Sequence, residues 1–334
     1  MSAFDPNAAS ADDSGVFGLP VRDDASVVLI PVPFEATTSY GDGAASGPSA
    51  LLAASRQVDL LDREVGTPYE AGVVMLEESP DVRSWNSRAA EAVRAARNGD
   101  DRACADVDAA CDALNTWLDG TATSLLDDGK IVGTIGGDHG SVYGAIAAHA
   151  RRHAGLGILH VDAHADLRRS YEGFRFSHAS ILDAVTRDCP NVERVVQVGI
   201  RDYCDEERRA IEGSESRIVT FFDADLSAAR FRGARFADQC ETIVDQLPES
   251  VYVTFDIDGL DPTLCPNTGT PVPGGLSFAE ASYLVGAVAR SGRRIVGFDL
   301  AEVAPGPEGD EWDANVGARL LYKLIGWTLI SRRA

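Results

Sequence analysis

The segment GILHVDAHADL (157–167) joins a mostly apolar run to a series of Asp and His residues at alternate positions. Its first half, Gly157–Val161, does not alternate between apolar and polar residues, which is typical of a strand buried on both faces of a parallel sheet. Similar runs predict seven further strands, at Val27–Val32, Gly72–Leu76, Ile131–Ile135, Val195–Ile200, Ile218–Phe222, Val251–Asp256 and Ile295–Leu300.

Longer amphipathic stretches lie between most of these strands, among them Ala105–Asp128, Ser141–His153, Ala234–Gln246 and Ser277–Ser291. Strands that alternate with helices predict an α/β fold of three layers, α/β/α, with a central, mostly parallel eight-stranded sheet. We expect residues 25–334 to form a single domain. Residues 1–24 are polar and small, which predicts a partly disordered arm. The charged, alanine-rich stretch 77–106 is predicted to be a surface excursion.

The overall charge argues against two classes of partner. The chain has 334 residues, with 30 Lys and Arg against 52 Asp and Glu, and its formal net charge is −22. Such a surface repels phosphate backbones and anionic lipid, so we expect neither a nucleic acid nor a membrane as partner. It suits a cationic substrate or a divalent metal, although for most of these carboxylates solvation of the surface is the better interpretation.

Cysteine usage and the N-terminus both predict a cytoplasmic protein. The six cysteines are scattered, with no CxxC pair, which argues against a disulfide framework and against a zinc knuckle. The first residues, MSAFDPNAASADDSGVFGLP, contain neither a basic region nor an apolar stretch, so no signal peptide is predicted. No segment reaches 18 uninterrupted apolar residues.

Four predicted strands are followed closely by acidic residues, two of them together with histidine. The segments that follow them are GGDHG (136–140), DAHAD (162–166), DIDGLDP (256–262) and AEV (301–303). In a parallel sheet, ligands bind beyond the carboxyl ends of the strands. Buried carboxylates at that edge would be unfavourable without a counter-charge, which a divalent metal supplies. Asp162, His164 and Asp166 are spaced by two residues, so in an extended segment they point the same way.

Two imidazoles and four carboxylates at these strand ends can hold two divalent ions, with two of the carboxylates bridging. Nitrogen and oxygen donors without a thiolate favour Mn²⁺, with Co²⁺ or Ni²⁺ as alternatives, over structural zinc. Two such ions would make a bridging water acidic enough to be hydroxide near neutral pH. Each motif alone could be structural, for example a tight turn at GGDH, but their joint placement at four strand ends favours the metal site.

The same segments resemble the arginase–agmatinase (ureohydrolase) family, and its agmatinase side in particular. The resemblance rests on GGDHG (136–140), HVDAHADL (160–167), TFDIDGLDPTLCPNTGTPVPGGLS (254–277) and PVPFEATTSYGDGAASGPSALLAAS (31–55), and it covers roughly residues 27–330. It implies a homo-oligomer, trimer or hexamer, that cleaves a guanidino group to urea and an amine.

The resemblance also implies a role for individual residues. One metal would be held by His139, Asp162, Asp166 and Asp256, and the second by His164, Asp162, Asp256 and Asp258. Asp162 and Asp256 would bridge the two ions, and Asp166 would also accept a hydrogen bond from the bridging hydroxide, which attacks the substrate. Glu302 would bind the substrate guanidinium through paired hydrogen bonds, and His178 would carry a proton to the leaving amine. For Glu302 the alternative is a surface or helix-capping carboxylate, and for His178 it is a cap of the helix that follows.

The other histidines are expected to lie outside the set of ligands. His149 and His153 belong to an Ala- and Arg-rich helical stretch and are predicted to be solvated. His160 ends a buried strand just before the ligands, and we expect it to be a hydrogen-bonded core histidine beside them.

Some features depart from the family pattern. Gly140 stands where Ser is usual, Arg168 and Arg169 follow the HVDAHADL block, and the segment Asp310–Asp313 lengthens the ending. The short loop RRSYEGFRFS (168–177) is similar to that of agmatinases. Hydrolysis of agmatine to putrescine and urea is therefore the leading hypothesis. The alternatives are guanidinobutyrate, free guanidine or arginine as substrate and, in another class, a non-catalytic metal-binding member. The roles of the arm and of segments 77–106 and 304–313 stay open.

Overall fold

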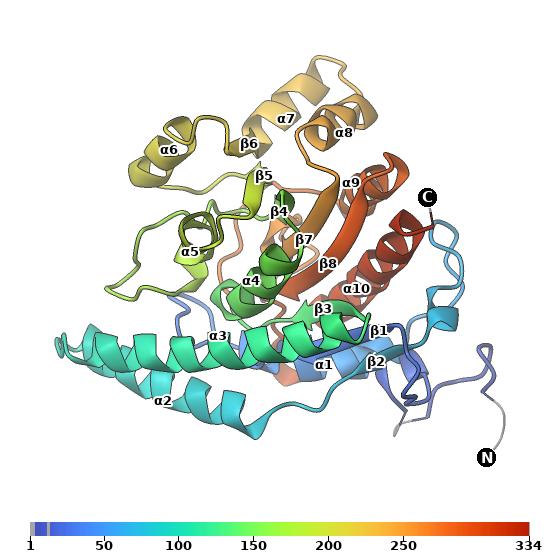
Figure 1. Ribbon diagram of the computed structural model, residues 1–334, viewed down its shortest axis with the longest axis horizontal. Coiled ribbons are helices and arrows are strands. Elements are labelled where there is room, and N and C mark those ends of the chain that lie inside the picture. Colours follow the sequence, from blue (N-terminus) through green and yellow to red (C-terminus); the bar gives the residue numbers. More distant parts are fainter. Residues whose placement is uncertain (1–3, 12–13, 334) are drawn as a thin grey trace.

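A single eight-stranded sheet forms the centre of the computed structural model, which describes residues 4–11 and 14–333 (Figure 1). The strand order is β2-β1-β3-β8-β7-β4-β5-β6, and every neighbouring pair is parallel. The strands are β1 (Val27–Pro31), β2 (Val73–Met75), β3 (Ile131–Ile135), β4 (Leu156–Val161), β5 (Val192–Ile200), β6 (Ile218–Phe222), β7 (Ser250–Asp256) and β8 (Arg294–Ala301). The predicted α/β fold with eight strands is confirmed.

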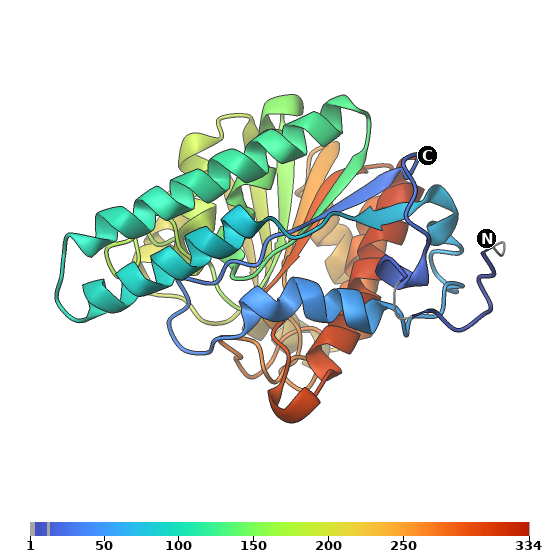
Figure 2. The ribbon, with the colours of Figure 1, turned by 90° about the horizontal axis from the view of Figure 1, so that it is seen from below.

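Helices cover both faces of the sheet, and this gives the three layers seen in Figure 2. One face packs against α1 (Gly47–Ser55), α8 (Phe236–Asp245), α9 (Phe278–Arg290) and α10 (Trp312–Ser331). The other face packs against α3 (Ala103–Asp127), α4 (Tyr143–Arg152) and α5 (Ile181–Asp188). Helices α6 (Asp205–Glu212) and α7 (Asp223–Phe231) lie beside the β6 edge. Burial on both faces explains why β1, β3 and β4 are continuously buried.

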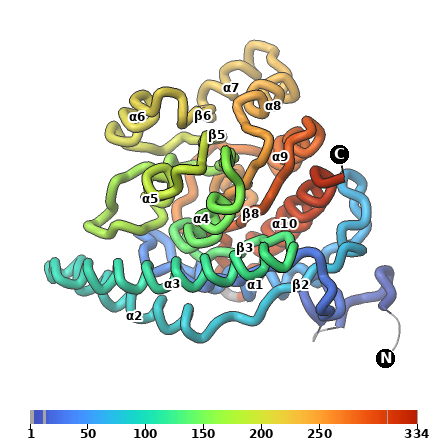
Figure 3. Tube along the Cα trace, viewed as in Figure 1, coloured from blue at the N-terminus to red at the C-terminus, as the bar shows by residue number. Residues whose placement is uncertain are grey.

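The stretch 77–106, predicted as a surface excursion, is instead largely helical. Helix α2 (Pro80–Arg97) runs beside α3, as Figure 3 shows. Val82, Ala89 and Val93 are buried against residues of α3 such as Val107 and Leu114. The spacing of seven and four residues places all three on one helical face, so the alanine-rich sequence forms a packed helical hairpin.

The polar arm predicted over residues 1–24 has a packed second half. Val16, Phe17 and Leu19 are buried. The backbone N–H of Phe17 donates to Ser55 Oγ at 2.9 Å, and its ring lies 4.9 Å from the ring of Tyr322 in α10. Three apolar side chains are enough to hold this part of the arm against α1 and α10. Residues 1–3, 12 and 13 of the arm, and residue 334, lie outside the described residues.

His149 is buried in α4, so the prediction that it is solvated is wrong; His153 is half-buried. The Nδ1–H of His149 donates to Ala145 O at 2.8 Å, one helical turn earlier. The ring can reach the sheet because β8 has Gly297 at the contact, where a Cβ would lie 2.1 Å from His149 Nε2.

In the part of the chain that the structure describes, no helix is long and apolar enough to span a membrane. All six cysteines are free thiols there, in agreement with their scattered positions in the sequence.

Candidate metal centre

The four polar segments meet at one edge of the sheet. Strands β3, β8, β7 and β4 are consecutive in the sheet, and their parallel pairing places all four carboxyl ends together. From β4 the chain continues to β5 on one side, whereas from its neighbour β7 it continues to β8 on the other side. The site therefore lies where the direction of sheet growth reverses, which is the usual ligand position in an open α/β sheet.

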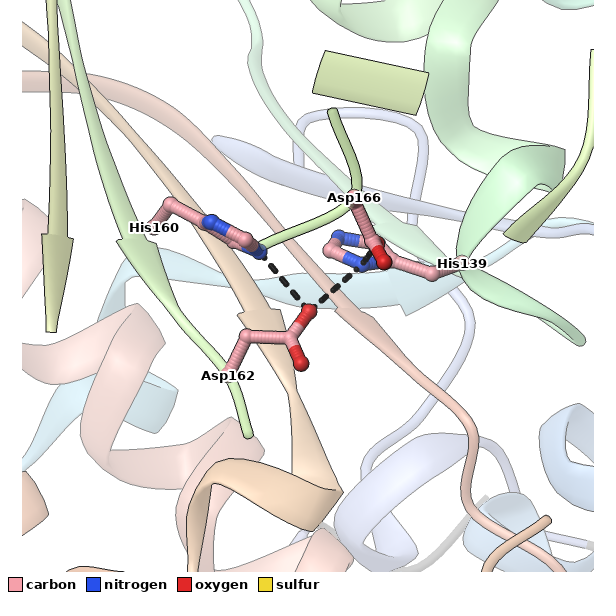
Figure 4. Close-up of side chains that lie close together, drawn as sticks. All are labelled: His139, His160, Asp162 and Asp166. Atoms are coloured by element: carbon pink, nitrogen blue, oxygen red, sulfur yellow. Dashed lines mark hydrogen bonds and ion pairs between the residues drawn. The ribbon is translucent and has the colours of Figure 1, made fainter. Parts of the chain in front are cut away.

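One cluster forms around His139, which begins the short 3₁₀ helix η4 (His139–Val142) after β3. Its Nδ1 atom lies 2.9 Å from Asp166 Oδ2, 3.0 Å from Asp162 Oδ2 and 3.7 Å from Asp256 Oδ2. All four side chains are buried. Figure 4 shows His139, Asp162 and Asp166 pointing toward one another, with His160 on the other side of Asp162.

A second cluster shares Asp162 with the first. His164 Nδ1 lies 3.0 Å from Asp258 Oδ2 and 3.5 Å from Asp162 Oδ1. Asp256 connects the two clusters, because its Oδ1 accepts the backbone N–H of Asp258 at 2.9 Å. The structure thus brings together all six residues that the sequence suggested as ligands, with Asp162 and Asp256 between the two groups. Their roles as ligands stay a prediction.

Burial and crowding perturb the charges at this site. Burial, together with Asp258 and Asp162, raises the pKa of Asp256 well above its usual range. Burial and Asp162 raise the pKa of Asp166 to about 7. Burial opposes protonation of His139, yet Asp162 and Asp166 outweigh it and raise its pKa. Such shifts indicate that the site holds more negative charge than its own residues neutralise.

This surplus of charge fits two divalent cations. In the described part of the chain, no Lys or Arg forms an ion pair with these aspartates; only histidines do. Four ionised aspartates carry four negative charges, which two divalent ions would balance. The nearby nitrogen and oxygen atoms lie close enough together to hold a metal in two groups, His139, His160, Asp162 and Asp166, and Asp162, His164 and Asp258. The residues present therefore fit a binuclear site.

Glu302 lies directly beside the His139 cluster, just after β8. Its Oε1 accepts the backbone N–H of His139 at 2.9 Å. Its Oε2 is buried and has no hydrogen-bond partner among the described residues. Burial and Asp138 raise the pKa of this carboxyl well above its usual range. The side chain therefore presents one unsatisfied oxygen, which a cationic donor would satisfy.

Two residues at the site have a backbone conformation that non-glycine residues rarely adopt. The φ angle is +54° at Asp166 and +61° at Glu302. Positive φ at these side chains stores strain of about 1–3 kcal/mol each, and such strain concentrates at functional sites. At Glu302 the strained geometry is held by two hydrogen bonds to its backbone, from its N–H to Gly137 O and from Thr268 Oγ1 to its carbonyl.

A cavity of about 170 Å³ opens beside the second cluster, lined by residues that include Ser39, His164, Asp166, Arg168, His178 and Asp202. Glu302 and Asp256 are not among its lining residues. Glu302 Oε2 instead faces Gly269, where a Cβ would lie only 3.3 Å away.

His178 lies on the rim of this cavity, at the start of the 3₁₀ helix η5 (His178–Ser180). Its backbone N–H donates to Thr37 Oγ1 at 3.1 Å, and its Nε2 lies 3.3 Å from Ser39 Oγ. The ring of Tyr171 stands edge-on to its imidazole at 5.4 Å. Burial lowers the pKa of His178 to about 4, so its ring is neutral at pH 7.

Gly140, where the family resemblance predicts a serine, lies against this rim. A Cβ at this position would lie 2.7 Å from the backbone carbon of Ser177 and 3.0 Å from the backbone nitrogen of His178. The loop that carries His178 therefore rests on the backbone after His139. A serine would not fit here without moving that loop.

The α2–α3 hairpin holds the rim in place, a role that the sequence did not predict. Arg97, at the end of α2, forms an ion pair with Glu172 at 2.7 Å and donates to Thr38 O at 2.7 Å. It thereby joins the loop of residues 33–46 to the loop of residues 168–177. From α3, Asp108 Oδ1 accepts the backbone N–H of Arg175 at 2.8 Å.

Comparison with known proteins identifies the family. Residues 25–326 match the sequence model described as "Arginase family". The chain belongs to the arginase family. This confirms the resemblance seen in the sequence blocks and makes the chain a ureohydrolase of this family; the family implies a binuclear metal site, which the His and Asp clusters fit.

The arginase-family relatives differ in substrate. The chain is 32% identical to an N(1)-aminopropylagmatine ureohydrolase of Thermus thermophilus, over 91% of this chain and 90% of the relative. It is 30% identical to the agmatinase of Bacillus anthracis, over 92% of this chain and 94% of the relative. Among solved structures it resembles a hypothetical agmatinase from Burkholderia thailandensis, with a TM-score of 0.74, 25% identity and coverage of 98% and 93% of the two chains.

Proposed function

We propose that this arginase-family enzyme hydrolyses agmatine to putrescine and urea. The observation that carries the proposal is the buried Glu302, whose Oε2 lacks a partner among the described residues while it lies next to the His139 cluster. Two divalent ions would balance the four aspartates, and a guanidinium would then balance Glu302. Its planar N–H groups suit paired, charge-assisted hydrogen bonds to a carboxylate.

The metal ligands follow from the two clusters. His139, Asp162, Asp166 and Asp256 would hold one ion, and His164, Asp162, Asp256 and Asp258 the other, with Mn²⁺ proposed and Co²⁺ or Ni²⁺ as alternatives. When bound, such a pair of ions supplies a water of lowered pKa, available as a nucleophile near neutral pH.

The protein's own groups would orient the reactants and move the proton. Glu302 would hold the planar guanidinium so that its carbon faces the nucleophile. Asp166 would accept a hydrogen bond from the nucleophile and keep its lone pair toward that carbon. The C–N bond to the amine then breaks, and the amine needs one proton. His178, which lines the same cavity as Asp166, would carry to the amine the O–H proton that the nucleophile loses as the C=O bond of urea forms.

The tail of the substrate would extend toward the rim. Asp202 is exposed there and suits the ammonium group of agmatine. Arg168 lines the same cavity; its Nε lies 3.8 Å from Glu207, and its guanidinium is half-exposed. Arg168 could therefore bind a carboxylate, which makes guanidinobutyrate the second candidate substrate.

A substrate panel tests the proposal. The chelated protein is loaded with Mn²⁺, Co²⁺ or Ni²⁺, and urea release is measured from agmatine, N(1)-aminopropylagmatine, guanidinobutyrate, arginine and guanidine. We expect agmatine to give the highest kcat/KM. Asp202→Asn should raise KM for agmatine but not for guanidinobutyrate, and Arg168→Gln should raise it for guanidinobutyrate but not for agmatine. Metal-loaded protein that releases urea from none of these compounds would contradict the proposal.

A further inference from the structure

Two imidazoles, not one, lie against Asp162. His139 Nδ1 is 3.0 Å from Asp162 Oδ2, and His160 Nε2 is 2.7 Å from the same oxygen. Figure 4 shows both rings directed at this carboxylate. By proximity alone, either ring could be a metal ligand. Which ring offers a lone pair and which offers a proton depends on the hydrogen bonds at the far nitrogen of each ring.

The far nitrogen of His139, Nε2, lies next to the hydroxyl of Thr254, which already donates its proton to Asp299. His139 Nε2 lies 2.9 Å from Thr254 Oγ1, and that hydroxyl donates to Asp299 Oδ1 at 2.9 Å. The same Asp299 oxygen also accepts the backbone N–H of Phe255 at 3.2 Å. Since the single proton of Thr254 goes to Asp299, its oxygen must accept from His139 Nε2–H. Since Nε2 keeps its proton, Nδ1 is the nitrogen that the neutral ring offers to a metal beside Asp162 and Asp166.

The far nitrogen of His160 is next to a donor. Gln197 Nε2 lies 2.7 Å from Ala165 O and 3.0 Å from His160 Nδ1. A carbonyl only accepts, so the amide nitrogen must face Ala165, and Gln197 Oε1 accepts from Thr220 Oγ1 at 2.8 Å. The second amide proton goes to His160 Nδ1. His160 therefore carries its proton on Nε2 and donates it to Asp162.

We propose that Asp299, through Thr254, and Gln197 are positioning residues of the metal centre. They hold His139 and His160 in the same Nε2–H tautomer, but the two rings present opposite edges to Asp162. His139 thus offers a lone pair and is the ligand, whereas His160 orients Asp162 by donating to it. The proposal rests on the proposed function only for the statement that His139 and Asp162 bind metal. Asp299, Thr254, His160 and Gln197 are fully buried, so water does not compete for these bonds.

The first test reads the tautomers directly. The protein is labelled with ¹⁵N-histidine, loaded with diamagnetic Zn²⁺, and its imidazole signals are recorded by NMR, with His139→Asn and His160→Asn variants for assignment. We expect a protonated Nε2 and an unprotonated Nδ1 on both rings. In Gln197→Glu, which has nearly the same shape but only accepts, the proton of His160 should move to Nδ1. A wild-type His160 protonated on Nδ1 would overturn the proposal, whether or not any variant folds.

The second test measures Zn²⁺ affinity with a matched pair of substitutions. Thr254→Ser keeps the hydroxyl and should bind Zn²⁺ as the wild type does. Thr254→Val keeps the shape but removes the acceptor, and its affinity should fall by about tenfold or more, the usual effect of losing a partner of a ligating histidine. Equal affinities of the two variants, both folded by circular dichroism, would overturn the proposal. Neither measurement needs turnover, so normal tautomers and affinities without urea release would count against the proposed function alone.

Discussion

The floor and the rim of the site are held in place by different kinds of interaction. The floor consists of side chains at the ends of β3, β4, β7 and β8, nearly all of them buried, and joined by hydrogen bonds and ion pairs in the interior. The rim consists of loops 33–46 and 168–177, joined by Arg97 and Glu172, whose side chains are 38% and 32% exposed. Removing one partner of a buried charge pair costs about 3–5 kcal/mol, whereas an exposed pair is worth about 0–1 kcal/mol. The comparison therefore predicts large effects at the floor and small ones at the rim.

The largest effect is expected for Asp256→Ala. Asp256 lies between the two clusters, 3.7 Å from His139 and hydrogen-bonded to the backbone of Asp258. Its loss should remove both metal ions and nearly all urea release, as measured by elemental analysis after desalting and by a urea assay. Asp245→Ala, an exposed aspartate on α8, is the control and should change neither quantity. A metal content of Asp256→Ala equal to that of the wild type would show that Asp256 is no bridge.

Glu302→Gln should impair the reaction without affecting metal binding. The substitution keeps the shape of the side chain but removes the charge that would pair with the guanidinium. Losing a charge-assisted hydrogen bond costs about 1.5–3 kcal/mol, so kcat/KM should fall by at least about tenfold. The metal content and melting temperature should stay near those of the wild type. If the variant hydrolyses every guanidino compound as well as the wild type does, the guanidinium is bound elsewhere.

His178→Ala should distinguish proton transfer at the rim from metal binding at the floor. The residue is placed to carry a proton, so kcat should fall while the metal content stays unchanged, and added imidazole should restore part of the rate. Measurements of kcat with and without imidazole, together with elemental analysis, check this. Loss of metal from the variant would mean that His178 belongs to the floor.

Arg97→Ala should have a smaller effect, confined to the rim. Loss of its bonds to Glu172 and Thr38 frees two loops that surround the cavity, so we expect a change of a few-fold in kcat and KM. The free energy of unfolding should change by no more than about 1 kcal/mol. Arg94→Ala, an exposed arginine one turn earlier on α2, is the matched control. Identical kinetic constants for the two variants would show that the rim does not depend on this contact.

The last effect is on stability alone and concerns His149, a buried group away from the metals. Burial lowers its pKa to about 4, against about 6.5 in an unfolded chain. Between these values the unfolded chain binds a proton that the folded one does not, so stability should fall as the pH falls from about 6.5 to 4. His149→Gln should remove this contribution, up to about 1.4 kcal/mol per pH unit. Denaturation with urea at pH 7 and pH 5, with chelator present, measures the difference; equal losses in wild type and variant would contradict it.

The sequence predicted the floor better than the rim because the floor residues lie at the ends of strands that can be recognised from a local run of apolar residues. Strands β3 and β6 have the predicted limits, and the remaining strands differ by one to three residues at one or both ends. Asp162, His164 and Asp166 follow a buried strand directly, so their convergence follows from the topology of the sheet. The contact of Arg97 with Glu172 joins residues 75 positions apart and leaves no local pattern.

Long-range packing also explains the other features that the sequence did not predict. His149 is buried because β8 has Gly297 where its ring lies, and Gln197 is a partner of His160 because β5 is the neighbour of β4. Neither relation can be derived from the helix or the strand alone. The same is true of Phe17, which finds its place only when α1 and α10 are both present.

One measurement tests the central claim most directly. The chelated protein is titrated with Mn²⁺, and both the bound metal per chain and the rate of urea release from agmatine are recorded at each point. The account predicts that the rate rises until two ions are bound per chain and then stays constant. Saturation at one ion, or two bound ions without urea release from agmatine or any other guanidino compound, would contradict it.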